Sequence, residues 1–214
     1  VKVAICLSSQ KNHSVRCGKK EKYKMTNKEN ILSAIRKNKK VSYPMPSFAD
    51  FTPVQYENKL EQFIDSVQLV GGHAVILKEG EDVNILIRSI YPDESVVASS
   101  LAYINADINP DKVEDPKELN GTGVGVVEGD FAVAENGCVW IPQTMKERAV
   151  LFISECLVII VKKDDIVNNM HEAYERVKTD SYGCFISGPS KTADIAQALV
   201  MGAQAARDVT VIII

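Results

Sequence analysis

The segment from Gly183 to Ile214 constrains the fold of this chain more than any other stretch. An apolar run, Cys184–Ile186, ends abruptly at the turn Ser187–Ser190, and a segment with apolar residues at helical spacing follows it. Gly202 closes that segment, and the β-branched run Val209–Ile214 comes last. This order predicts a strand, a tight turn, a helix and a second strand, which form the βαβ crossover of a parallel sheet.

The turn in this predicted unit is the first candidate ligand site. Open α/β sheets bind ligands at the carboxyl ends of their strands. The N-terminus of the following helix offers unpaired N–H groups and the positive end of its dipole to an anion. We therefore expect a small anionic ligand, a carboxylate or a phosphate, to be bound by Ser187, Gly188, Pro189, Ser190, Lys191, Thr192 and Asp194.

Two other interpretations of the same turn must be weighed. In a structural interpretation, Ser190 is an N-cap, Pro189 initiates the helix and Lys191 is solvated. A P-loop is excluded, because Pro189-Ser190 stand where that motif requires Lys followed by Ser or Thr, although Gly183 and Gly188 have the right separation.

A second candidate site lies at Glu135-Asn136-Gly137. Residues 131–134 and 139–141 predict two short strands around an Asn-Gly turn, which is typical of a hairpin. A carboxylate at such a turn can reach into a cleft, so Glu135 is the candidate catalytic residue, as nucleophile or base, and Asn136 and Gly137 are candidate ligand-binding residues. Oxyanion donors near Gly137 and Gly188 require the two loops to meet. The alternative is that the turn is only structural and Glu135 is solvated or paired.

Strands alternate with helices from about residue 52 onward, which predicts an α/β domain with a mostly parallel sheet flanked by helices. His73, next to a buried strand, is expected to be a hydrogen-bonded core residue. The predicted helices cover residues 26–38, 52–70, 79–90, 145–154 and 164–177. The further predicted strands cover residues 74–77, 96–98 and 157–161, and residues 105–125 form a long loop with one helical turn at 116–119.

Charge divides the chain unevenly. Residues 1–40 hold 12 Lys and Arg against 2 Glu, and the remainder holds 13 basic against 26 acidic residues. A basic arm can contact nucleic acid, but a disordered tail with a solvated amphipathic helix explains the same pattern, and we expect no nucleic-acid partner. The predicted organisation is a disordered or upstream extension (1–24), an N-terminal helix with a linker (25–51) and an α/β domain (52–214).

Several classes of protein are excluded by composition. The apolar runs are too short for a membrane span, so we expect no membrane partner. The five cysteines form no Cys-x-x-Cys pair, and no His lies at metal-ligand spacing to them. This predicts reduced thiols in a cytoplasmic protein, with no metal site and no bound cofactor in this chain.

Three motifs resemble the LUD-domain family, and within it the lactate utilisation protein C branch. They are Ser-Gly-Pro-Ser-Lys-Thr-Ala-Asp-Ile from Ser187, Gly-Asp-Phe-Ala-Val-Ala-Glu-Asn-Gly from Gly129, and Leu-Val-Ile-Ile-Val from Leu157. In order they cover residues 26–214. The chain departs from the family at Ala196, where Glu is frequent, and at Gln204-Ala205-Ala206, where His-Gly-Pro is frequent.

The resemblance implies a NagB/RpiA/CoA-transferase-like fold and a cytosolic subunit of an L-lactate utilisation system. That system converts lactate to pyruvate, with the redox centres in iron–sulfur partner proteins, and this chain would contribute an anion-binding cleft. Two alternatives remain open. The Glu135 turn is similar to the nucleophile motif of CoA transferases, so the chain can be a free-standing enzyme of the CoA-transferase or sugar-phosphate-isomerase type. It can also be a non-catalytic ligand sensor. A homo-oligomer is compatible with each.

Overall fold

The computed structural model describes residues 26–39, 41, 43, 44, 46, 47, 51–177, 182–192, 200–202 and 205–214. Contacts divide the chain into two units, with the border between Asp50 and Phe51. The first unit contains helix α1 (Asn27–Asn38), whose first turn is closed by a capping box between Thr26 and Glu29. Residues 1–24, predicted to be an extension, lie outside the described residues.

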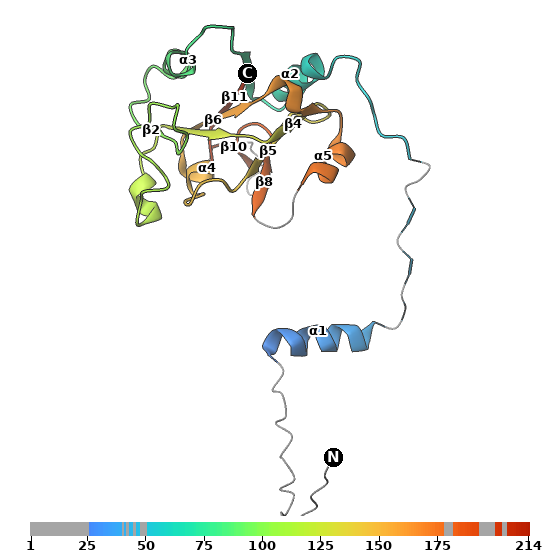
Figure 1. The fold of residues 1–214 in the computed structure, drawn as a ribbon. Helices are drawn as coiled ribbons and strands as arrows, with labels where there is room; N and C mark the ends of the chain where they lie inside the picture. Colours follow the sequence, from blue (N-terminus) through green and yellow to red (C-terminus); the bar gives the residue numbers. More distant parts are fainter. Residues whose placement is uncertain are drawn as a thin grey trace, which may run out of the picture. The chain divides into compact units, whose positions relative to one another are not determined.

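The main sheet of the second unit has five strands, and all neighbouring strands run parallel. Its middle strand is apolar and buried along its whole length, as expected for a parallel sheet covered on both faces. The mostly parallel α/β fold is thus confirmed (Figure 1), whereas the NagB/RpiA/CoA-transferase-like label stays a prediction. The strands, in spatial order, are β1 (His73–Ile76), β11 (Asp208–Ile213), β6 (Cys156–Val161), β3 (Val124–Glu128) and β2 (Val97–Ala98).

A smaller sheet packs against one face of the main sheet. It contains the predicted hairpin, which turns at Gly137 with a φ of 67°. Its strands, in spatial order, are β7 (Ile166–Val167), β4 (Phe131–Val133), β5 (Cys138–Pro142) and β8 (Gly183–Ile186).

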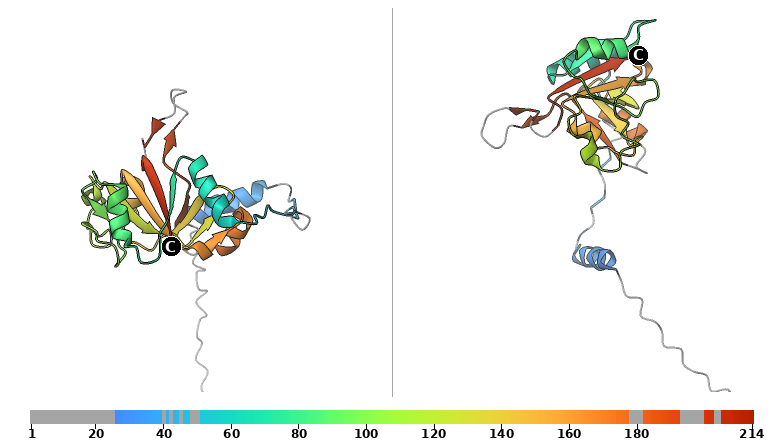
Figure 2. Two further views of the ribbon diagram at one scale, coloured as in Figure 1. Left: turned by 90° about the horizontal axis from the view of Figure 1, so that it is seen from above. Right: turned by 90° about the vertical axis from the view of Figure 1, so that its left-hand side faces the viewer.

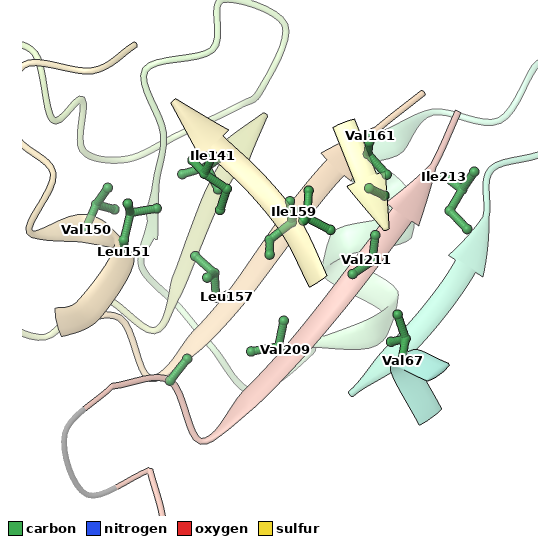
Figure 3. Packing of buried hydrophobic residues seen from close by; sticks show 14 of the residues in the cluster. Val67, Ile141, Val150, Leu151, Leu157, Ile159, Val161, Val209, Val211 and Ile213 are labelled. Atoms are coloured by element: carbon green, nitrogen blue, oxygen red, sulfur yellow. The ribbon is translucent and has the colours of Figure 1, made fainter. Parts of the chain in front are cut away.

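Side chains alternate along β6 between two apolar clusters. Leu157, Ile159 and Val161 face the smaller sheet, together with α2 (Lys59–Leu69) and α4 (Val150–Ile153), as Figure 3 shows. Val158 and Ile160 face α3 (Val83–Ile90) on the other side. Within the described residues, no helix is long and apolar enough to cross a membrane.

The predicted βαβ unit at the C-terminus is wrong. β8 belongs to the smaller sheet, where it pairs antiparallel with β5, and only β11 lies in the parallel sheet. In place of the two ends of the predicted helix, β9 (Lys191–Thr192) and β10 (Val200–Met201) form an antiparallel ribbon, which stands away from the sheets in dark red in Figure 2. The N–H of Ser190 donates to the Ala206 carbonyl, and its carbonyl accepts from Gly202, so the first backbone groups of the predicted helix are already paired over long range.

Four other predicted helices are shorter than expected. The helix predicted over residues 79–90 begins at Val83, after the left-handed Gly80 and the N-cap Asp82. The other three are shortened because side chains or neighbouring strands bind their backbone. Residues 52–58 do not join α2. The Val54 carbonyl accepts a hydrogen bond from the Asn169 side chain, and the Tyr56 N–H donates to the Asn168 side chain. The predicted helix over residues 164–177 is interrupted by β7, which pairs with β4, and only α5 (Met170–Arg176) forms. α4 likewise retains a single turn of the helix predicted over 145–154.

The remaining expectations divide into one that is confirmed and two that are wrong. The helical turn at Pro116–Leu119 forms as predicted, as the 3-10 helix η1. A second short 3-10 helix, η2, covers Lys163–Asp165. The loop predicted over residues 105–125 is wrong at its end, because β3, a buried strand that was not predicted, begins there at Val124. His73 is not a core residue, because its side chain is exposed beside Asp208, at 3.4 Å.

Candidate functional site

Five of the predicted ligand-binding residues line one open cleft of about 320 Å3. They are Ser187, Gly188, Pro189, Ser190 and Lys191. The cleft follows the carboxyl end of β8, but it lies at the amino ends of β6 and β11, where Leu157 and Val209 form part of its wall. The rule that open parallel sheets bind ligands at the carboxyl ends of their strands therefore does not account for the position of this cleft in the main sheet.

The C-terminus of α2 holds the loop that lines the cleft. Gly188 has a φ of 65°, and a Cβ at that position would lie 2.8 Å from the Val70 carbonyl oxygen. The Lys191 ammonium donates to the same carbonyl. The residue at position 188 must therefore be small and in the left-handed region for the loop to reach α2.

The predicted mechanism of anion binding needs correction. Lys191 begins a strand rather than a helix, so no helix N-terminus faces the cleft at this point. Its ammonium group instead stabilises the negative C-terminal end of α2. Thr192 is the second residue of β9, and Asp194 lies outside the described residues, so its predicted contact with the ligand stays a prediction.

The two predicted loops do meet. The Ser187 hydroxyl donates to the Asn136 carbonyl at 2.9 Å, and the Ser66 hydroxyl of α2 donates to the Ala134 carbonyl at 2.7 Å. Gly137 packs so closely on α2 that a Cβ there would lie 2.7 Å from the Val67 nitrogen. The hairpin turn therefore supports the loop at Ser187, and the N–H of Gly137 is already used by Val133 of the same turn.

Glu135 points away from this cleft, toward α5. Its carboxylate accepts a hydrogen bond from the Met170 N–H at 2.9 Å, at the first residue of that helix. The side chain is exposed, and Glu135 is not among the residues that line the cleft beside Ser187. The structure thus gives Glu135 a structural partner, and its role as a catalytic residue stays a prediction.

Most of the cleft wall was missed by sequence reasoning, because it is apolar and comes from distant parts of the chain. Residues 205 and 206 could have been found, since they lie where the sequence departs from the family motif. The missed wall residues are Leu151, Phe152, Leu157, Phe185, Ile186, Ala205, Ala206 and Val209.

The described thiols are held protonated by their surroundings. Burial raises the pKa of Cys138 to about 12 and that of Cys156 to about 11, and it also raises the pKa of Cys184. Within the residues that the structure describes, no group of three His, Cys, Asp or Glu side chains is arranged to hold a metal ion.

Known proteins resemble this chain in sequence. The LUD domain model matches residues 99–214, which is more than half of the chain. Lactate utilization protein C 1 of Bacillus mycoides is 34% identical over 101 residues, which are 43% of this chain and 43% of the relative. Lactate utilization protein C of Geobacillus thermodenitrificans is 22% identical over 184 residues, covering 81% of this chain and 74% of the relative. The protein of the same name from Oceanobacillus iheyensis is 28% identical over 100 residues, and this chain spans 43% of its length.

A solved structure supports the same fold. The crystal structure of a DUF162 family protein from Deinococcus radiodurans superimposes with a TM-score of 0.58 at 17% identity. The match covers 75% of this chain and 99% of that protein. Because the family model covers more than half of the sequence, the chain belongs to the LUD domain family.

Proposed function

We propose that this protein is a cytoplasmic component of a lactate utilisation system, and that the cleft beside Ser187–Lys191 binds a small anionic ligand in that system. The observation that carries the proposal is the cleft itself, because the family-like motif from Ser187 to Lys191 contributes five consecutive residues to one wall. The relatives named lactate utilization protein C support the system to which the ligand would belong.

The side chains of this chain indicate which steps of the proposed system it performs and which its partners perform. Oxidation of lactate to pyruvate removes a hydride equivalent and a proton, so it needs an electron acceptor. The described thiols have raised pKa values and are poor metal ligands in that state. We therefore place the electron acceptors in iron–sulfur partner proteins and assign ligand binding and complex formation to this chain.

The decisive experiment is growth on L-lactate of a strain that lacks this protein. The strain is complemented with wild type or with Ala205→Phe, which would fill the cleft from a half-buried wall position. Ala102→Phe is the matched control, because Ala102 is exposed and outside the cleft. Immunoblots confirm equal protein levels.

We expect wild type and Ala102→Phe to restore growth, and Ala205→Phe to fail. Normal growth of the deletion strain on L-lactate would contradict the proposed system. Full complementation by Ala205→Phe would contradict the role of the cleft while leaving the system assignment in place.

Two further tests address the alternatives and the partners. Glu135→Gln is included in the same assay, since loss of growth with that variant alone would favour an enzyme that uses Glu135. Affinity purification from lactate-grown cells should recover partners with bound iron and acid-labile sulfide. Recovery of this chain alone would contradict the predicted complex.

A further inference from the structure

We infer that the cleft beside Ser187–Lys191 takes a monocarboxylate whose apolar body is longer than that of lactate. The inference rests on the proposed ligand site and narrows the class of ligand. It follows from three features of the cleft, which are its charge, its remaining hydrogen-bonding groups and its apolar volume.

The polar groups of the cleft are few, and most are already bound. The Ser187 hydroxyl donates to Asn136, and the Lys191 ammonium donates to Val70. The backbone N–H and carbonyl of Ser190 pair with Ala206 and Gly202. Among the described side chains of the cleft, the hydrogen-bond donors left for a ligand are the Ser190 hydroxyl and the remaining ammonium protons of Lys191. One cation and one hydroxyl match a single carboxylate, whereas a phosphate dianion is bound by more charged donors.

The charge next to the cleft excludes a ligand with a second anionic group at its other end. A neighbouring cleft shares Phe152 and Ala205 with it and contains Arg207. That guanidinium lies 2.7 Å from a carboxylate oxygen of Glu94 and 3.5 Å from one of Glu155. Two carboxylates outweigh the single positive charge, so the carboxylate of the ligand belongs at Lys191 and its uncharged body points toward Phe152.

The size of the cleft indicates how large that body is. A space of about 320 Å3 holds about ten water molecules at ~30 Å3 each. This is the lower end of the volume range of sites for drug-sized ligands. Lactate would leave most of the apolar wall, including the 42% exposed Phe152, in contact with water. A longer apolar body removes that wall from water, and this burial supplies most of the binding free energy.

The test is a calorimetric titration of the purified full chain with straight-chain monocarboxylates from acetate to octanoate, and with L-lactate and inorganic phosphate. We expect the Kd to fall about fourfold for each added CH2 until the cleft is full. Phosphate should bind more weakly than the longer acids.

Three variants separate the cleft from the rest of the surface. Lys191→Met should raise the Kd of every acid about tenfold without changing the dependence on chain length. Ala205→Phe should remove that dependence, and Ala102→Phe should leave both unchanged. Circular dichroism confirms that each variant is folded.

Several results would overturn the inference. One is equal affinity along the acid series, and another is equally tight binding of alcohols of the same length. Absence of binding up to millimolar acid, or an unchanged series in Ala205→Phe, would also overturn it. Each of these is distinct from failure of the proposed function, which is decided by growth of the deletion strain on lactate.

Discussion

Replacement of Gly188 by Ala tests whether close contact with α2 shapes the candidate site. Gly188 has a φ of 65°, and an added Cβ would lie 2.8 Å from the Val70 carbonyl oxygen and 2.9 Å from a Val70 methyl carbon. Ordinary van der Waals contacts of a Cβ begin near 3.4 Å. The loop or the end of α2 must therefore move by about half an ångström, as in an overpacked core.

The expected cost has two parts. The left-handed conformation costs about 1 kcal/mol for Ala, once the smaller entropy of its unfolded state is included. The steric overlap adds about 1–3 kcal/mol. Together these lower the free energy of unfolding by about 2–4 kcal/mol, which corresponds to a fall in Tm of roughly 4–16 °C for a unit of this size.

Gly80→Ala provides the matched control. Gly80 has a φ of 84°, and a Cβ there would have no atom within 4 Å. This variant should show the conformational cost alone, a fall in Tm of roughly 2–4 °C. Both variants are measured by urea and thermal denaturation, and octanoate binding is titrated in parallel.

The comparison between the two glycines decides the matter. If Gly188→Ala is no more destabilised than Gly80→Ala, the added Cβ does not overlap with Val70 at the end of α2, and the reasoning is refuted. If it is destabilised as expected and also binds octanoate more weakly, α2 positions the cleft wall.

Three further predictions concern titratable groups. Glu135→Gln should lower the free energy of unfolding by about 0.5 kcal/mol or less, because it removes a negative charge from the N-terminus of α5, and it should leave growth on lactate unchanged; urea denaturation measures the first effect and the complementation assay the second. Burial acts to raise the pKa of Glu172, but hydrogen bonds from the Asn168 N–H, the Gln55 side chain and the Asn168 side chain outweigh it and lower the pKa. This stabilisation is present above the unfolded pKa of about 4.3 and is lost as the pH falls through the lower folded pKa. Glu172→Gln should therefore lose less stability than wild type between about pH 5 and pH 3 in acid denaturation. Equal losses of stability in the two proteins would contradict this role of Glu172. Cys138, whose pKa burial raises to about 12, should resist iodoacetamide at pH 8 in the native protein and react in urea, as mass spectrometry would show; rapid native labelling would mean that the hairpin opens.

Strands were predictable where the residues themselves exclude other structures. The apolar run of β6 and the terminal β-branched run of β11 form strands with nearly the predicted ends. The Asn136-Gly137 turn forms the hairpin, because an Asn-Gly pair readily adopts the tight turn that joins antiparallel strands. These features depend on local conformation and burial, which a sequence pattern reports directly.

Helices were mispredicted where distant groups bind the backbone. The amphipathic stripe from Tyr56 to Val67 is real, yet its first residue lies outside α2, because Asn168 and Asn169 bind residues 54–56 from more than a hundred residues away. A helical periodicity gives only an intrinsic preference, and hydrogen bonds of this kind outweigh it.

The sequence by itself determined the class of fold and most of the buried strands, though not β3, because these depend on residue type and spacing, and it grouped Ser187–Lys191 in one short segment. Only the tertiary structure decided where that loop lies. It pairs Ser190 with Ala206, sets Lys191 on the end of α2 and turns Glu135 toward α5. These contacts join residues far apart in the chain, and their geometry depends on how the two sheets pack, which no local pattern encodes.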